Sequence, residues 1–191
     1  EALANVRGAT AISARLTQQL MAFSREGAVT VETLDLNRLV AGIRPILKAA
    51  LTGRCRLHLY MEPEDILPIK VNGILVEQVV MNLVFNARNA MEDPQGVIAL
   101  RTRREGSDHV IREVEDTGKG MSQEVLARAF EPFYTTRQGS GGTGLGLATV
   151  YGIVTRFEGN ITLESEEGVG TVCRVKLPLG DPSEIAPLPR G

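Results

Sequence analysis

Three asparagines on one face of a predicted helix are the first side chains whose spacing suggests chemistry. Asn82, Asn86 and Asn89 stand at positions i, i+4 and i+7 of an amphipathic segment, so one stripe of the helix carries three carboxamides. Amides lower the propensity of a helix, and Lys or Glu would serve a solvated stripe better. Uncharged oxygen ligands suit Mg²⁺ that phosphates already hold, because this ion keeps several waters and needs few protein donors. The stripe therefore indicates a phosphate-bound metal ion, with a solvated polar face as the plainer alternative.

A carboxylate at the end of a predicted strand is the second candidate. Asp116 directly follows the strand over residues 110–115, and Gly118 and Gly120 come after it. The carboxylate could accept a hydrogen bond from an exocyclic amine, and the glycines would let the backbone approach a flat ring closely. Alone, the segment is better explained by an ordinary Asp-Thr-Gly turn. The interpretation as an amine-binding carboxylate therefore depends on the presence of the other motifs.

The segment over residues 130–150 changes character halfway. Residues 130–137 are aromatic, contain a proline and end in two hydroxyls and a cation. Residues 139–146 then contain five glycines, and an apolar helix is predicted from Leu145 onward. Glycines let the backbone approach a ligand, and a helix N-terminus binds anions readily. The pattern therefore predicts a mobile lid that leads into a phosphate site.

Other nucleotide-binding motifs do not account for these glycines. Gly139, Gly141 and Gly144 have the spacing of the dinucleotide fingerprint, but that fingerprint needs a buried strand just before its first glycine. Residues 135–138 are Thr-Thr-Arg-Gln and form no such strand. The pattern G-x-x-x-x-G-K-[ST] and the eukaryotic-type kinase signatures are absent from the sequence. These three classes are therefore excluded.

Apolar residues at helical spacing predict the helices that position the candidate side chains. The helix of the asparagine stripe runs from residue 72 to 91. Another is expected from Asn37, as its N-cap, to about residue 51, although Pro45 should kink or restart it. A short helix over residues 122–129 and a longer one from 145 to about 159 complete the set.

Alternation of apolar and polar residues predicts about five strands, and residues 26–33 are expected to form a polar turn region. The strands are expected over residues 57–61, 97–103, 110–115, 161–165 and 171–177. The expected fold is an α+β two-layer sandwich. A mixed sheet of about five strands carries about three helices on one face.

Both ends of the chain differ from this body. Apolar residues at alternating spacings of three and four over residues 2–25 predict a long bundle-type helix that needs a partner helix, or else packs on its own domain. Beyond Pro178 the chain is rich in proline and reads as a linker or tail. The chain begins at Glu1 rather than Met, which suggests a fragment of a longer protein.

The composition bounds the class of protein. The 191 residues are 43% apolar and 23% charged, which is typical of a soluble globular chain. A net charge of −2 provides no electrostatic footprint for nucleic acid or an anionic membrane. Cys55 and Cys173 are isolated, so neither a disulfide framework nor a metal-ligand pattern is expected. No stretch is apolar enough to span a bilayer.

Read together, the motifs resemble the ATP-binding domain of bacterial sensor histidine kinases. These kinases belong to a wider group of ATPases that includes type II topoisomerases and the ninety-kilodalton heat-shock chaperones. The resemblance spans residues 8–178 and implies the Bergerat-type ATP-binding fold. It rests on five boxes in the family's order: Asn82-Leu-Val-Phe-Asn86-Ala87, Asp116-x-Gly118-x-Gly120-Met121, Phe130-Glu-Pro-Phe133, Gly142-Thr-Gly144-Leu-Gly146-Leu147 and Gly168-x-Gly170-Thr171.

The resemblance also implies a division of the chain. Residues 1–28 would be the second helix of a dimerisation and phosphoacceptor hairpin whose first helix is missing. Residues 29–178 would be the ATP-binding catalytic domain, and residues 179–191 a Pro-rich linker or tail.

Roles follow from the resemblance, position by position. Asn86 would coordinate Mg²⁺, Asn82 would lie beside the γ-phosphate, and Asp116 would bind the adenine amino group. Arg137 would contact the phosphates from the lid, and Thr171 would stand behind the adenine. The remaining expected nucleotide-binding residues are Asn89, Gly118, Gly120, Thr135, Thr136, Gly142, Thr143, Gly144, Leu145, Gly146 and Leu147.

The implied activity is transfer of the γ-phosphoryl group of ATP to a histidine, for onward transfer to the aspartate of a response-regulator receiver domain. The acceptor would lie on the missing helix of the same or a partner subunit, in a homodimer, in the cytoplasm of a bacterium, with a membrane anchor possible upstream. His58 and His109 fall in or beside predicted strands and read as ordinary strand residues. No nucleic-acid or membrane contact is expected of this chain.

Two alternatives stay open. Asn89 stands where relatives usually carry Asp, which keeps a degenerate scaffold that binds ATP without phosphotransfer in consideration. A hydrolase of the wider ATPase group is the second alternative. Such enzymes usually place a water-activating Glu where Asn82 stands, so hydrolysis would be slow.

Overall fold

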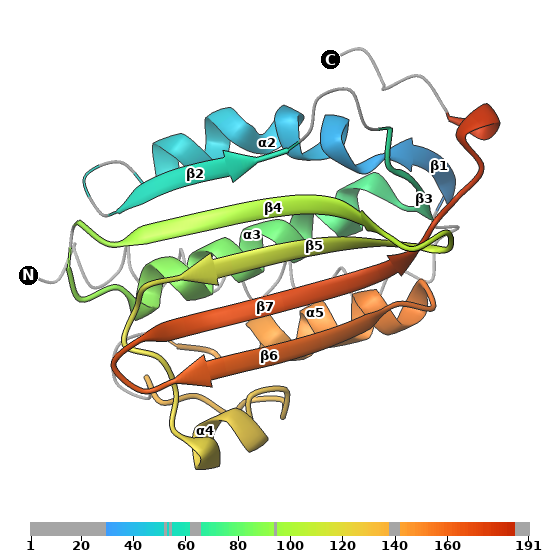
Figure 1. Cartoon of the computed structure of the whole chain (residues 1–191). Helices are drawn as coiled ribbons and strands as arrows, with labels where there is room; N and C mark the ends of the chain where they lie inside the picture. The colour runs from blue at the N-terminus through green and yellow to red at the C-terminus, as the bar shows by residue number, and fades with distance from the viewer. Residues whose placement is uncertain are drawn as a thin grey trace, which may run out of the picture.

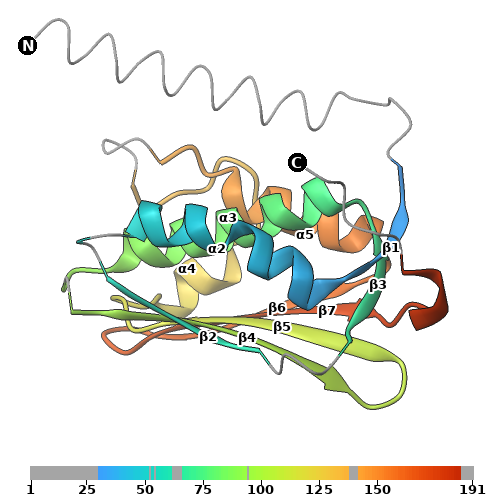
Figure 2. The ribbon, with the colours of Figure 1, turned by 90° about the horizontal axis from the view of Figure 1, so that it is seen from above.

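The computed structural model describes residues 30–51, 53, 55–61, 66–93, 95–137 and 142–185. A sheet forms one layer and helices cover one of its faces (Figures 1 and 2). The elements in chain order are β1 (Glu32–Asp35), α2 (Leu36–Leu51), β2 (Arg56–Tyr60), β3 (Pro68–Val71), α3 (Gly73–Ala90), β4 (Val97–Glu105), β5 (His109–Asp116), α4 (Gln123–Ala127), α5 (Gly146–Arg156), β6 (Asn160–Glu166), β7 (Gly170–Pro178) and the 3₁₀ turn η1 (Pro182–Glu184).

The main sheet has five strands in the order β2-β4-β5-β7-β6. The pair β2 and β4 is parallel and the other pairs are antiparallel, so the sheet is mixed. A parallel pair needs a crossover connection, and α3 lies in the connection between β2 and β4. All five predicted strands belong to this sheet, and the predicted two-layer fold is confirmed.

The core lies between the inner face of the sheet and the helices α2, α3 and α5 (Figure 2). Each helix buries one apolar stripe, because residues three and four apart share a face. In α3 the buried stripe consists of Val76, Val79, Val80, Leu83, Val84 and Ala87. The asparagines of α3 lie off this stripe, so packing on the sheet leaves them available to a ligand.

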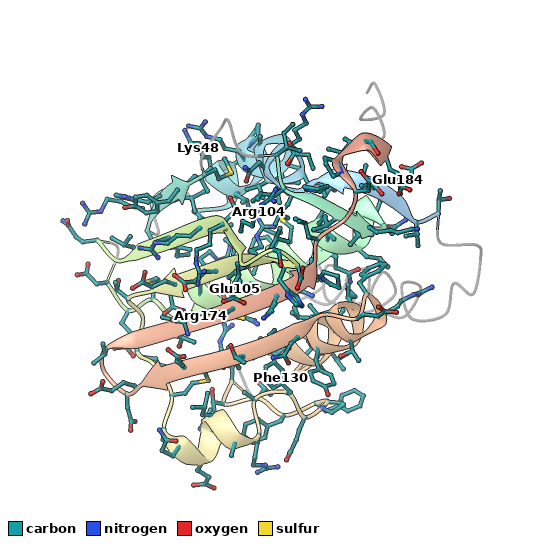
Figure 3. All side chains as sticks on the ribbon, turned by 45° about the vertical axis from the view of Figure 1, so that its right-hand side comes forward. Lys48, Arg104, Glu105, Phe130, Arg174 and Glu184 are labelled. Carbon is teal, nitrogen blue, oxygen red and sulfur yellow. The ribbon has the colours of Figure 1, made fainter. Side chains whose placement is uncertain are left out.

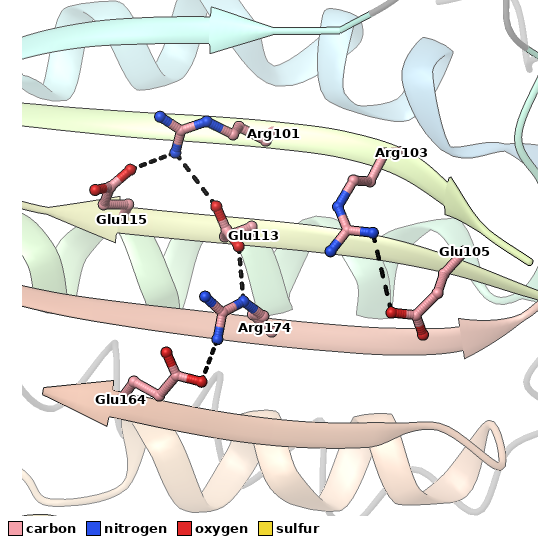
Figure 4. Close-up of polar contacts among 7 residues, drawn as sticks. All are labelled: Arg101, Arg103, Glu105, Glu113, Glu115, Glu164 and Arg174. Atoms are coloured by element: carbon pink, nitrogen blue, oxygen red, sulfur yellow. Dashed lines mark hydrogen bonds and ion pairs between the residues drawn. The ribbon is translucent and has the colours of Figure 1, made fainter.

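The outer face of the sheet carries a network of charged side chains (Figure 4). Glu113 on β5 accepts from Arg101 of β4 at 3.3 Å and from Arg174 of β7 at 2.8 Å. Arg101 also pairs with Glu115, and Arg174 reaches Glu164 of β6 at 2.5 Å. Each exposed ion pair contributes little to stability. The network crosses four strands, and its chief effect is to keep this face of the sheet hydrated.

The start of α2 differs from the sequence prediction. The Asp35 carboxylate accepts from the backbone N–H groups of Asn37 at 3.0 Å and Leu67 at 3.3 Å, so Asp35 and not Asn37 caps the helix. Asn37 lies inside the helix, where its buried amide oxygen accepts from the Thr102 hydroxyl at 2.5 Å. The helix does not restart at Pro45, which is exposed.

The prediction for α3 is confirmed at both ends. Asn72 precedes the helix, and its side chain accepts from the backbone N–H of Leu75 at 3.1 Å. Met91 follows the last helical residue, Ala90. The asparagine stripe is therefore held on a helix with a defined start.

A small second sheet was not predicted. Strand β1 pairs antiparallel with β3, and β1 includes Thr33, so the expected turn region over residues 26–33 is wrong at its end. Pro68 begins β3, where its missing N–H costs no ladder hydrogen bond. Both strands have four residues, too few for alternation to reveal.

Residues 179–185 pack against this small sheet. The backbone N–H of Leu179 donates to the Asp108 carbonyl at 2.8 Å, and that of Gly180 donates to the Pro68 carbonyl at 2.7 Å. The Thr33 hydroxyl donates to Glu184 at 3.3 Å, and Ile185 forms a parallel bridge with Thr33 (Figure 3 labels Glu184). Residues 179–185, the first part of the predicted linker or tail over residues 179–191, are therefore held against the domain by these contacts.

The expected domain boundaries at residues 28/29 and 178/179 stay predictions. The bundle-type helix expected over residues 1–28, and the end of the expected tail over residues 186–191, lie outside the described residues.

The contacts of residues 179–185 predict a contribution to stability. A chain that ends after Pro178 should have a free energy of unfolding about 2 kcal/mol lower, as measured by urea denaturation. The reason is the loss of two backbone hydrogen bonds and of the Thr33–Glu184 hydrogen bond. A chain ending after Ile185 is the control and should match the full chain. Equal stability of the two shortened chains would contradict the assigned contacts, and amide exchange in β1 would locate any loss.

Candidate active site

A cleft of about 1640 Å³ opens between α3, the start of α5 and the ends of β5 and β7. All but two of the predicted nucleotide-binding residues line it, the exceptions being Gly118 and Leu145. The lining predicted residues are Asn82, Asn86, Asn89, Asp116, Gly120, Thr135, Thr136, Arg137, Gly142, Thr143, Gly144, Gly146, Leu147 and Thr171. Segments more than 80 residues apart in the chain therefore meet in one concave site, the usual form of a ligand pocket.

The asparagine stripe faces the first residue of α5. The Asn82 amide donates to the Gly146 carbonyl at 3.5 Å. A Cβ placed on Gly146 would lie 3.4 Å from both the nitrogen and the oxygen of the Asn86 amide. Asn86 is exposed to the cleft, whereas Asn89 is half-buried and its oxygen accepts from Arg88 at 3.4 Å. Two of the three amides thus lie at the start of α5, and the third lies farther along α3.

The N-terminus of α5 carries no side-chain cap. Leu145 occupies the cap position, and its side chain makes no capping hydrogen bond. The first N–H groups of a helix have no intrahelical partner, and the helix dipole favours negative charge there. Together with the adjacent amides of Asn82 and Asn86, this terminus can bind a phosphate group.

Asp116 lies buried at the other end of the cleft, where β5 ends. Its side chain accepts from the backbone N–H of Gly118 at 2.9 Å. Burial raises the pKa of Asp116 to about 6, although backbone hydrogen bonds from Gly118 and Thr171 act in the opposite direction. The carboxylate is therefore ionised at neutral pH and can accept a hydrogen bond from a ligand's amino group.

Glycines permit backbone contacts that no other residue could make here. Gly120 has φ +65°, and a Cβ on it would lie 1.9 Å from the Glu166 carbonyl oxygen. Gly144 has φ +66°, and a Cβ on it would lie 2.3 Å from the carbonyl carbon of Phe133. Phe133 donates its N–H to the Gly144 carbonyl at 3.0 Å, so the two ends of the predicted lid are joined.

The lid residues lie at the edge of the cleft. The backbone N–H of Arg137 donates to the Thr135 hydroxyl at 3.1 Å, and Gly142 donates to the Arg137 carbonyl at 3.3 Å. Thr136 and Arg137 both line the cleft. The rest of the predicted lid, residues 138–141, lies outside the described residues.

The cleft also contains residues that the sequence did not predict as nucleotide-binding. Cys173 and Leu163 line it from β7 and β6, and inward alternation along these strands could have identified them. Tyr134 lines it as well, with the Arg128 guanidinium 4.2 Å from its ring centroid. Lys119 adds a second cation and stands inside the Asp-x-Gly-x-Gly box.

The donor set fits a metal ion that arrives with phosphates. Among the described residues, no group of three His, Cys, Asp or Glu side chains is arranged to hold a metal. The Asn86 amide, exposed to the cleft beside Gly146, offers an oxygen ligand near the start of α5. One neutral ligand suits Mg²⁺ whose other ligands are phosphate oxygens and waters.

Comparison with known proteins identifies the family. Residues 72–181 match the family model described as histidine kinase-, DNA gyrase B-, and HSP90-like ATPase. The chain belongs to this ATPase family. The match runs from the cap of α3 to the start of η1, so it includes every element that lines the cleft. Membership of this family supports the use of ATP by the domain.

Relatives of this ATPase are sensor kinases. The chain is 41% identical over 180 residues to sensor kinase CckA of Brucella abortus, covering 87% of this chain and 19% of that protein. It is 31% identical over 166 residues to sensor histidine kinase ZraS of Salmonella typhimurium, covering 86% and 35%. The chain thus spans between about a fifth and a third of these relatives and corresponds to one part of them.

Solved structures agree with the family. The catalytic domain of histidine kinase ThkA superposes with a TM-score of 0.69 at 26% identity, over 78% of this chain and 96% of that one. Full-length ShkA, solved in complex with AMPPNP, gives a TM-score of 0.76 at 23% identity over 95% of this chain and 38% of that one. The ShkA likeness bears on the fold alone.

The expectations for the two histidines and for membrane-spanning segments can be compared with the structure. His58 lies on β2 and His109 begins β5, as ordinary strand residues. In the described ranges, every helix is too short or too polar to cross a membrane.

The burial of Asp116 predicts a pH-dependent stability. Its folded-state pKa lies above the unfolded value, so the stability it contributes is present below about pH 4 and is lost as the pH rises through about 6. Asp116→Asn should therefore stabilise the nucleotide-free domain by about 2 kcal/mol at pH 7.5 and by little at pH 4, measured by urea denaturation. The same substitution should lower ATP affinity.

Asp108→Asn, on an exposed turn away from the cleft, is the control and should leave ATP affinity unchanged in calorimetric titrations. A pH-independent effect of Asp116→Asn would contradict the raised pKa.

The backbone contact at Gly144 predicts a local requirement for glycine. Gly144→Ala should lower ATP affinity about tenfold or more in calorimetric titrations, because the added Cβ displaces Phe133 and strains a positive φ. Gly152→Ala is the matched control, since nothing lies within 4 Å of its Cβ position in α5. The control should bind ATP normally and gain about 0.5–1 kcal/mol of stability. Unchanged affinity in Gly144→Ala would refute the role of this contact.

Proposed function

We propose that this chain is the catalytic, ATP-binding part of a sensor histidine kinase, which transfers the γ-phosphoryl group of ATP to a histidine. One observation carries the proposal: the amides of Asn82 and Asn86 face the uncapped start of α5, in the same cleft as the buried carboxylate of Asp116. The cleft therefore has an end for the phosphates and an end for the base. Family membership and the sensor-kinase relatives support the same activity.

At the base end, Asp116 accepts a hydrogen bond from the adenine amino group. Its position below the surface, with 8% of the residue exposed, makes this bond strong and selective for a donor at that point. The absence of side chains at Gly118 and Gly120 lets the backbone beside Asp116 pack against Ala90 and Glu166. Thr171 lies behind the ring on β7. Cys173 adds an apolar surface under the base.

At the phosphate end, Asn86 would supply an oxygen ligand to Mg²⁺ and Asn82 would lie beside the γ-phosphate. When bound, Mg²⁺ neutralises phosphate charge during transfer. The backbone N–H groups around Gly144 and Gly146 donate to phosphate oxygens, and Arg137 adds a positive charge from the lid. Asn82 is an amide and not a general base, which disfavours activation of water and leaves the histidine as the acceptor.

The acceptor comes from outside this chain, because His58 and His109 are the only histidines in the sequence and lie on strands. An imidazole nitrogen that is neutral near pH 7 is a competent nucleophile. We place it on the first helix of a dimerisation hairpin, in the same or the partner subunit of a homodimer. A receiver domain then takes the phosphoryl group, in the cytoplasm of a bacterium.

The test uses a form of the protein extended upstream to include that hairpin, incubated with [γ-³²P]ATP and Mg²⁺. The expected product is acid-labile, base-stable label on the hairpin, reduced at least about 100-fold by Asn86→Ala. Asn160→Ala, at the exposed start of β6, is the control and should label normally.

The other results separate the alternatives. ATP binding without label in the extended protein would replace the kinase by an ATP-binding scaffold. Release of labelled phosphate without labelled protein would replace it by a slow ATPase.

A further inference from the structure

One arginine lies in the core, away from the nucleotide cleft. Arg112 is the middle of β5 and faces the helices, on the same side of the strand as Val114 and Asp116. Only 2% of its surface is exposed. None of its three guanidinium nitrogens has a hydrogen-bond partner among the described residues.

Apolar side chains surround this guanidinium. The cross-strand neighbours of Arg112 are Val175 on β7 and Thr102 on β4. The Thr102 hydroxyl already donates its hydrogen to the amide oxygen of Asn37. Val79 of α3 and Phe157, just beyond α5, line a cavity of about 10 Å³ beside Arg112. That volume corresponds to about one water-sized particle.

The charge of Arg112 persists at neutral pH. Burial lowers its pKa to about 9, which is still two units above 7, and no carboxylate contributes to that pKa. Among the described residues, the two buried acids, Asp35 and Asp116, are engaged elsewhere. Asp35 caps α2 and pairs with Arg38 at 3.5 Å, and Asp116 belongs to the cleft. A buried charge without a counter-charge is strongly destabilising, so this cation requires one.

We propose that Arg112 forms a buried site for a single small inorganic anion of about the size of chloride, between the sheet, α3 and α5. An anion accepts hydrogen bonds from the guanidinium and neutralises it, and its remaining surface can contact apolar walls. A water molecule would also accept, but apart from Arg112 every residue that lines the cavity is apolar, so the lining side chains offer its two hydrogens no acceptor.

The site is separate from the proposed kinase chemistry, but it lies between the two helices that carry that chemistry. α3 holds Asn82 and Asn86, and α5 begins at Gly146. Anion binding therefore stabilises the packing of these helices on the sheet without contacting ATP.

The experiment measures the melting temperature of the full 191-residue chain while chloride replaces gluconate at constant ionic strength. The wild-type chain should gain about 3 °C by 0.3 M chloride. Arg112→Met removes the cation with little change in volume and should abolish the chloride response. Arg103→Met, on the outer face of the sheet, is the control and should keep it.

A direct measurement keeps the proposal testable if Arg112→Met does not fold. Crystals of the wild-type chain grown in chloride should show a long-wavelength anomalous peak within hydrogen-bonding distance of the Arg112 guanidinium. No peak there, or an equal chloride response in the wild-type and Arg112→Met chains, would overturn the proposal.

Discussion

The contact between α3 and the first turn of α5 is the constraint on which the site depends. Gly146 has no side chain, so the amides of Asn82 and Asn86 approach the start of the second helix closely. A Cβ at position 146 would lie 3.4 Å from the Asn86 amide, in van der Waals contact, and a longer side chain would fill the space beside that amide. Because both helices bury apolar stripes on the same sheet face, their separation is set by the core. The phosphate end of the cleft therefore derives its geometry from packing.

The base end depends on a different physical compromise. Asp116 is buried enough to raise its pKa to about 6, and the unliganded domain is less stable for it. Two backbone N–H groups, from Gly118 and Thr171, limit that cost without replacing a ligand. A base that donates to the carboxylate would recover the lost free energy, and binding would stabilise the domain. The site thus exchanges stability for a selective hydrogen-bond acceptor.

The two faces of the sheet treat charge in opposite ways. On the outer face, Glu113 is shared by Arg101 and Arg174, and solvent reaches the network. On the inner face, Arg112 stands one residue from Glu113, and yet its guanidinium has no hydrogen-bond partner in the described part of the chain. Because successive side chains of β5 point to opposite faces of the sheet, Glu113 lies in the hydrated network and Arg112 lies in the core.

The sequence by itself determined the five-stranded sheet, the long helices and a set of nucleotide-binding candidates, nearly all of which line the cleft. Apolar periodicity is a local property, and the ordered Asn, Asp and Gly boxes needed no structure to indicate an ATP site. Local patterns could not reveal β1 and β3, or the attachment of residues 179–185, because these depend on hydrogen bonds between distant segments such as Thr33 and Glu184.

The same reason explains the cap of α2, where tertiary packing buried the Asn37 side chain against Thr102 and left Asp35 to accept the backbone N–H of Asn37. Only the tertiary structure decided that Arg112 lies in the core, since a strand pattern alone does not say which face the helices cover.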